Sequence, residues 1–288
     1  MTPVPLSRTS WWLTVPACVL CLLGAAAAAS ATQDKSGSTT DGDGGQHPAK
    51  SLTAQAGDPT APLLQFQVTN FYSPDVRNGD GYANQLNFQP VLPLPPGRVI
   101  PVEQVLRMTV PYLTSPGPDR KSGLGDVDFL DVFVPHPTPK DVFGIGFTLT
   151  MPTASDSRLG SGSWQIGPAA TWVYYGIENW QIGGILQNPI SFAGEGDRES
   201  VNILELQPVI NYVWGDWYFG AGDFNAVWDW EESEATVPLA FQVGKIQKIG
   251  RHSLNLSAEF EWTAIYPDDA VVPRWGIKLG FVLLLPEG

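Results

Sequence analysis

The sequence predicts an all-β fold, a transmembrane antiparallel β-barrel of about 12 strands with a disordered N-terminal segment. Three observations support this prediction. From Leu63 onward, apolar and polar side chains alternate with a period of two in repeated segments, and no apolar run long enough for a membrane-spanning helix occurs there. Short and mostly longer connections follow one another between the alternating segments, as they do in bacterial barrels.

The composition agrees with a fold of many short strands. The chain of 288 residues has 30 glycines and 26 prolines, while 16% of its residues are charged and 11% are aromatic. Glycine and proline at this frequency interrupt helices and supply turns. The formal net charge of −13 disfavours contact with phosphate backbones, so we expect no binding of nucleic acid.

Residues 1–31 are typical of a secretory signal peptide. Arg8 precedes an apolar stretch over 11–23, and Ala29-Ser30-Ala31 offers a cleavage site between small residues. An uncleaved anchor, or a lipoprotein cleaved before Cys18, are the alternatives. Both cysteines, Cys18 and Cys21, lie within this segment, so the predicted mature chain has no thiol and no disulfide.

Residues 32–62 form the second predicted region, a disordered periplasmic spacer. Ser, Thr, Gly, Asp, Gln and Ala dominate it, and large apolar side chains are scarce. Such a segment buries too little apolar surface to offset the entropy that ordering would cost. The predicted barrel then extends over 63–288.

The barrel strands are predicted from the alternation of side chains. In 253–262 one face is wholly apolar and the other wholly polar, and the segments that end at Met151 and at Leu285 repeat the pattern. The twelve predicted strands are 63–72, 83–93, 99–111, 125–135, 142–151, 163–175, 179–189, 200–213, 217–230, 236–246, 252–264 and 274–285. Because a lipid-exposed sheet edge leaves backbone groups unpaired, we expect the first strand to pair with the last.

The lengths of the connections orient the predicted barrel in the membrane. Connections after even-numbered strands are short, such as 176–178, while those after odd-numbered strands are mostly longer, such as 112–124; the connection 231–235 is the exception. Short turns face the periplasm in bacterial barrels, so both termini are expected there. Tryptophan and tyrosine near the strand ends indicate aromatic belts at the two membrane interfaces. The alternative is that these side chains fill the core of a soluble protein.

Three short motifs carry a resemblance to a known family. They are Gly123-Leu124-Gly125-Asp126-Val127, Gly144-Ile145-Gly146-Phe147 running into Met151-Pro152-Thr153, and Gly162-Ser163-Trp164-Gln165-Ile166-Gly167-Pro168. In this order they resemble the outer-membrane proteins named for the phenol meta-cleavage pathway, over roughly residues 63–285. The resemblance implies a transporter-like barrel, associated in some members with uptake of aromatic or other hydrophobic compounds.

The polar faces of the strands are expected to line the lumen. The charged lumen-lining candidates are Glu103, Arg107, Glu205, Asp223, Glu259, Glu261 and Lys278. Acids outnumber bases in this set, which favours small cations or polar neutral solutes over anions. Alternatively the charges pair with one another and only make the barrel rigid. Trp217 and Phe219 are the candidates for apolar contact with a hydrophobic solute.

Three function classes follow from this lumen. The first is a channel or transporter for small solutes, and the second is a structural or ligand-binding barrel without transport. An outer-membrane enzyme is the least favoured, because His47, His136 and His252 all fall outside the predicted outer rim. We expect no cofactor and no metal, and the expected partners are outer-membrane lipid, lipopolysaccharide, the barrel-assembly machinery and a small-molecule solute.

Overall fold

The computed structural model describes residues 52–56, 58–196, 198–222, 224–250 and 252–285. The predicted signal peptide and most of the predicted spacer lie outside these residues. The elements are α2 (Leu52–Ala56), β1 (Leu64–Arg77), β2 (Ala83–Leu94), β3 (Glu103–Thr114), β4 (Ser122–Leu124), β5 (Val127–Val134), β6 (Asp141–Met151), β7 (Ser163–Tyr174), β8 (Trp180–Gln187), β9 (Ile190–Gly194), β10 (Ile203–Trp214), β11 (Trp217–Gly220), β12 (Ala226–Asp229), β13 (Glu234–Ile249), β14 (His252–Ile265) and β15 (Val272–Leu285).

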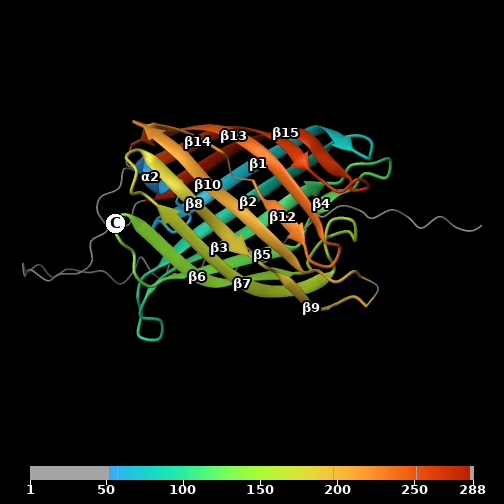
Figure 1. Ribbon diagram of the computed structural model, residues 1–288, viewed down its shortest axis with the longest axis horizontal. Helices are drawn as coiled ribbons and strands as arrows, with labels where there is room; N and C mark the ends of the chain where they lie inside the picture. The colour runs from blue at the N-terminus through green and yellow to red at the C-terminus, as the bar shows by residue number, and fades with distance from the viewer. Residues whose placement is uncertain (1–51, 57, 197, 223, 251, 286–288) are drawn as a thin grey trace, which may run out of the picture.

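The strands form one closed antiparallel sheet (Figure 1). Three walls of the barrel are each built from two segments: β4 and β5 both pair with β3, β8 and β9 both pair with β7, and β11 and β12 both pair with β10. The strands of the described residues therefore occupy twelve positions around the barrel, which confirms the predicted strand number. Closure is confirmed as well, because β1 pairs with β15 in the register Val68↔Phe281.

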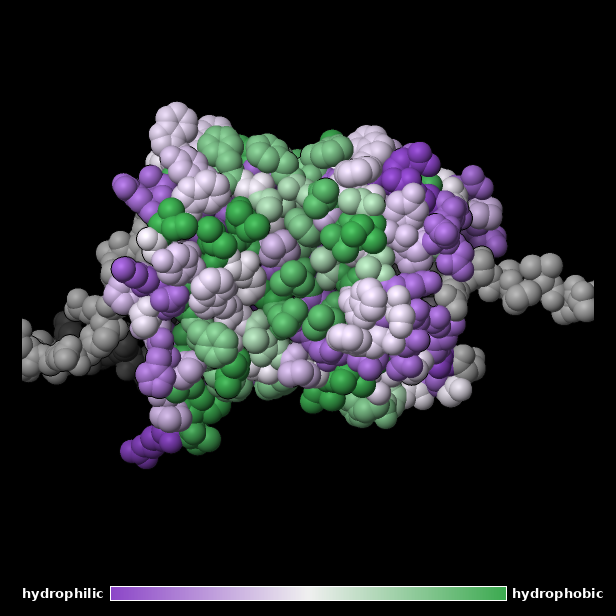
Figure 2. All heavy atoms as spheres, viewed as in Figure 1, coloured by the Kyte–Doolittle hydropathy of each residue, from purple (hydrophilic) through white to green (hydrophobic). Residues whose placement is uncertain are grey.

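The two faces of the sheet differ as the alternation predicts. Apolar side chains point outward from every part of the wall, among them Phe241, which is 61% exposed, and Leu279, which is 58% exposed. They gather over the middle of the barrel, while hydrophilic residues gather toward its ends (Figure 2). An apolar belt between polar rims is the surface that a bilayer covers, so the chain is placed in the outer membrane. Among the described residues, no helix has the length and apolar character needed to cross a membrane.

The ends of the barrel are distinguished by their connections. The short turns, the start of β1, the end of β15 and α2 share one rim, at the left in Figure 1, and this is the rim that the loop lengths predict to face the periplasm. The longer loops lie at the other rim. One of them is anchored by the buried Asp126 of the glycine motif, whose carboxylate accepts backbone N–H bonds from Ala154 at 3.0 Å and from Ser161 at 2.6 Å. The motif therefore has a structural role in holding the 152–162 loop.

The described end of the predicted spacer is folded. Residues 52–56 form α2, and Asp58, Thr60 and Ala61 are all at least 96% buried. Ala61 belongs to an apolar cluster with Leu63, and Ile246 and Leu284 of the barrel wall complete that cluster. Burial against a wall that is distant in sequence supplies the apolar contact that the segment lacks by itself. For residues 58–62 the expected disorder is thus replaced by packing inside the periplasmic mouth.

Candidate channel lumen

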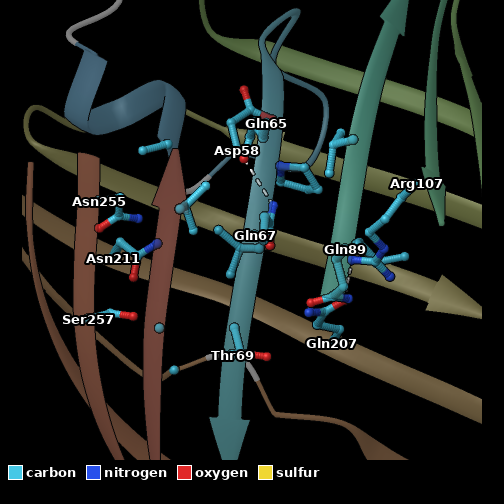
Figure 3. A pocket seen from close by; sticks show the side chains of 18 of the residues that line it. Asp58, Gln65, Gln67, Thr69, Gln89, Arg107, Gln207, Asn211, Asn255 and Ser257 are labelled. Carbon is cyan, nitrogen blue, oxygen red and sulfur yellow. Dashed lines mark hydrogen bonds between the residues drawn. The ribbon is translucent and has the colours of Figure 1, made fainter. Parts of the chain in front are cut away.

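The lumen holds a chamber of about 140 Å³ below the periplasmic mouth (Figure 3). Its lining comes from most of the barrel walls together with Ala56, Asp58 and Pro59 of the N-terminal segment. The chamber has two chemically distinct sides. Amide and hydroxyl side chains dominate the lining from β13, β14 and β1, and aliphatic side chains form the lining from β5 and β8, which lie across the barrel according to the strand order.

The amide side is formed by side chains that already bond to one another. Gln67 Nε2 donates to Gln65 Oε1 at 3.0 Å, and Gln242 Nε2 donates to Asn211 Oδ1 at 3.0 Å (Figure 3 shows the first of these bonds). The Tyr218 hydroxyl donates to Asn255 at 3.1 Å. Because each amide carries two donors and an acceptor with two lone pairs, this side can bond to solutes of either hydrogen-bonding character.

The aliphatic side is part of a larger apolar cluster inside the barrel. The buried members of that cluster are Leu130, Val132, Val134, Val142, Ala169 and Ile185. Leu130, Val132 and Ile185 also line the chamber. This cluster could not be predicted from the sequence, because β5 carries apolar residues on both of its faces and an aspartate on each. Alternation alone could not decide which face of β5 points inward.

Arg107 of β3 is the basic side chain of the chamber lining. Its Nη1 donates to Gln207 Oε1 at 3.3 Å, while its buried Nε has no hydrogen-bond partner. Arg107 attracts two carboxylates electrostatically, Glu205 and Asp128. Glu205 accepts a bond from Gln187 Nε2 at 2.7 Å. Arg107 and Glu205 were predicted to line the lumen, whereas Asp128 was missed because of the ambiguous pattern of β5.

A second charged cluster joins β14 to β15. Lys278 Nζ lies 2.8 Å from Glu261 Oε1 and 3.1 Å from Glu259 Oε1, and both glutamates are almost fully buried. The three residues lie on the inner face of the sheet, opposite to the exposed Phe260, and their role in lining a conducting path stays a prediction. Glu259 and Lys278 thus pair with each other, as in the alternative in which the lumen charges neutralise one another. One ammonium group shared by two carboxylates leaves a small net charge, so the cluster contributes less negative potential than two free glutamates.

Two of the predicted positions require correction. Trp217 and Phe219 of β11 pair in register with Trp214 and Tyr212 of β10 on the outer face of the sheet, and Trp217 is 42% exposed. They are therefore not available for contact with a solute in the lumen. Tyr218, which is 5% exposed, points inward instead. The reason is the break between β11 and β12, which shifts the alternation that a single strand over 217–230 would have kept.

The remaining lumen-lining candidates are Glu103, at the start of a strand, and Asp223. Glu103 is the first residue of β3 and pairs in register with Val134, so it lies at the periplasmic end, away from the chamber lining. Asp223 lies outside the described residues. Thus the structure brings Arg107 and Glu205 to one site and Glu259, Glu261 and Lys278 to another.

Comparisons with solved structures agree with this architecture. The NanC porin aligns with a TM-score of 0.52 at 8% identity, over 77% of this chain and 100% of that one. An outer-membrane channel from Pseudomonas putida F1 aligns with a TM-score of 0.56 at 13% identity, over 85% of this chain and 100% of that one. The outer-membrane phospholipase A of Escherichia coli aligns with a TM-score of only 0.41 at 11% identity, over 77% and 92% of the two chains. No family model and no curated protein matches the sequence.

The fold and the lumen together define the class. The chain is an outer-membrane β-barrel of twelve strands whose fold is shared with porins and channels. At these identities the likeness concerns the fold alone, and the solute has to be argued from the lumen.

Proposed function

We propose that the protein is an outer-membrane channel for small solutes that combine an apolar surface with hydrogen-bonding groups, such as hydroxylated aromatic compounds. The two-sided chamber is the observation that carries this proposal. Val132 and Ile185 on one side offer apolar contact, and Gln65 and Gln242 on the other offer hydrogen bonds. A narrow site of this kind favours a flat solute that presents a different chemistry to each side.

The charges near the chamber support a solute that is close to neutral. Arg107 is balanced by nearby carboxylates, and Lys278 balances its glutamates. A strongly charged solute would have to give up its hydration without an unpaired partner of opposite charge. The resemblance to the family of the phenol meta-cleavage pathway agrees with the same solute class and stays a prediction.

The proposal is tested by permeation into liposomes that contain the refolded protein. We expect a hydroxylated aromatic to enter faster than a neutral polyol of similar size. Val132→Thr keeps the volume of the side chain and places a hydroxyl on the apolar side, so it should slow the aromatic solute by about fivefold. The polyol should be affected much less.

Val134→Thr is the matched control for this change. Val134 belongs to the same apolar cluster and faces inward from the same strand, but it does not line the chamber. Its substitution should leave both permeation rates nearly unchanged. Equal slowing by the two variants would contradict the proposal, because it would reflect a loosened barrel and no contact with the solute.

The other predicted roles are distinguished by the same measurement. A barrel that passes neither solute, where a known porin passes both, would favour the structural or ligand-binding role. The prediction that the protein is not an enzyme continues to rest on its histidines: His136 and His252 lie at the periplasmic rim. Lipopolysaccharide and the barrel-assembly machinery stay predicted partners; for the latter, the pattern Arg274, Gly276, Leu279 and Phe281 in the last predicted strand is similar to a barrel-assembly signal.

A further inference from the structure

The periplasmic mouth of the barrel is occupied by the chain itself. We call residues 52–56 and 58–62 the mouth segment. Ala56, Asp58 and Pro59 of this segment form one boundary of the chamber, next to the first residues of β1 (Figure 3). A solute that has entered the chamber from outside therefore meets the mouth segment before it reaches the periplasm.

The mouth segment contacts the barrel wall at several points. Thr53 Oγ1 donates to the backbone oxygen of Gly215, in the turn between β10 and β11, at 3.1 Å. Ala61 packs in a cluster with Ile246 of β13 and Val282 of β15. These contacts include a hydrogen bond and small apolar side chains, and the described residues of the mouth segment form no strand pairing with the barrel, which would hold them more firmly.

A further contact crosses the mouth to the opposite wall. Asp58 is 4% exposed, and its carboxylate accepts the backbone N–H of Thr60 at 2.8 Å and the hydroxyl of Tyr175. Tyr175 directly follows β7, on the side of the barrel away from β13. Burial, and then the negative charge of Asp58, raise the pKa of the Tyr175 phenol, so the hydroxyl keeps its proton and continues to donate.

We propose that the mouth segment is a gate between the chamber and the periplasm, and that the hydrogen bond from Tyr175 to Asp58 is its latch. This inference rests on the proposed channel function. The mouth segment is covalently joined to the start of β1, so it would rotate about that point when the gate opens. The latch residue Asp58 lies across the mouth from there, beside Tyr175. Opening the latch frees the chamber toward the periplasm without breaking any strand pair of the barrel.

The gate is tested by locking it shut. Because the predicted mature chain has no cysteine, Thr53→Cys and Asp216→Cys introduce a single pair of thiols, one on the mouth segment and one in the turn beside it. A short bis-methanethiosulfonate should link the two, which mass spectrometry detects. Permeation of a hydroxylated aromatic into liposomes should then fall at least tenfold and return after reduction, while treatment of the single variant Asp216→Cys with the same reagent should leave its permeation unchanged.

The latch is tested by a second pair of variants. Tyr175→Phe removes the hydroxyl that bonds to Asp58, and a bond to a charged group is worth about tenfold in an equilibrium, so single-channel open probability should rise by about that factor. Tyr174→Phe is the control, because Tyr174 stacks on Trp172 at 6.0 Å between ring centroids and is not part of the latch.

The outcomes separate the gate from the channel. Failure of the cross-link to form, or unchanged permeation in the locked protein, would overturn the gate and leave the channel function standing. An equal rise of open probability in Tyr174→Phe and Tyr175→Phe would overturn the latch. If the locked, reduced and Tyr175→Phe proteins all pass no solute, the proposed channel function fails, and the gate fails with it.

Discussion

The two charged clusters of the lumen differ in how completely they are neutralised. On β14 and β15, Lys278 lies within 3.1 Å of both Glu259 and Glu261, and all three side chains bond within the cluster. Across the barrel, Arg107 donates to an amide at 3.3 Å and leaves its Nε without a partner. The first cluster connects two neighbouring strands, whereas the second reaches from β3 toward β10 and borders the chamber.

This difference indicates a division of roles among lumen charges. A buried carboxylate that loses its partner cation is costly, so the Lys278 cluster holds the barrel together. Arg107 lines the chamber, and the carboxylates near it balance its charge without a close ion pair, so its cluster lies beside what passes. Counting the charges that point into a barrel therefore overestimates the field that a solute meets.

The largest expected effect is on stability, at the Lys278 cluster. Lys278→Met keeps most of the aliphatic stem and leaves two buried glutamates without their cation, so it should lower the free energy of unfolding by about 3–5 kcal/mol. Urea unfolding in lipid vesicles measures this. Lys245→Met is the control, since Lys245 points outward over the Trp217 ring at 5.0 Å and should cost about 1 kcal/mol or less. Similar losses for the two variants would remove the distinction between structural and chamber charges.

The next effect tests the orientation of the strand that carries the cluster. Phe260 is 49% exposed on the outer face of β14, next to the inward Glu259. Phe260→Arg should cost about 2–4 kcal/mol if it lies at the bilayer midplane, because a guanidinium there loses its hydration. The same unfolding measurement should show a smaller loss for Glu259→Gln, which leaves Lys278 with Glu261. Equal tolerance of both changes would mean that the assignment of the faces is wrong.

The smallest effect on stability, and the clearest on selectivity, is expected near Arg107. Glu205→Gln removes a negative charge beside the chamber and keeps the side-chain volume, so cation preference should fall in bilayer recordings. Glu261→Gln should change selectivity less, because Lys278 already compensates that charge. The difference should be largest near 0.01 M salt, where the Debye length is about 30 Å, and should vanish near 1 M. A larger shift for Glu261→Gln would reverse the roles assigned to the clusters.

Prediction from sequence succeeded where a strand is continuous and failed where it is broken. β14 and β15 pair without a register shift from Ser253↔Leu284 to Trp262↔Trp275, and every charged residue predicted there faces as expected. Between β11 and β12 the ladder is interrupted, so Trp217 and Phe219 point to the opposite face from the one predicted. Alternation propagates only along an unbroken ladder, and one irregularity reverses every side chain beyond it.

The sequence by itself determined the strand number, the closure of β1 on β15 and the apolar outer belt. The strand number and the apolar belt depend on local alternation and on loop length, which can be read from residues close together in the sequence. Closure follows because the bilayer core holds no water to bond to an open sheet edge. The tertiary structure alone decided the chamber and the mouth segment. Arg107 meets Gln207 across 100 residues, and Asp58 meets Tyr175 across 117. Such contacts depend on which walls lie opposite after the barrel closes, and no local pattern records that arrangement.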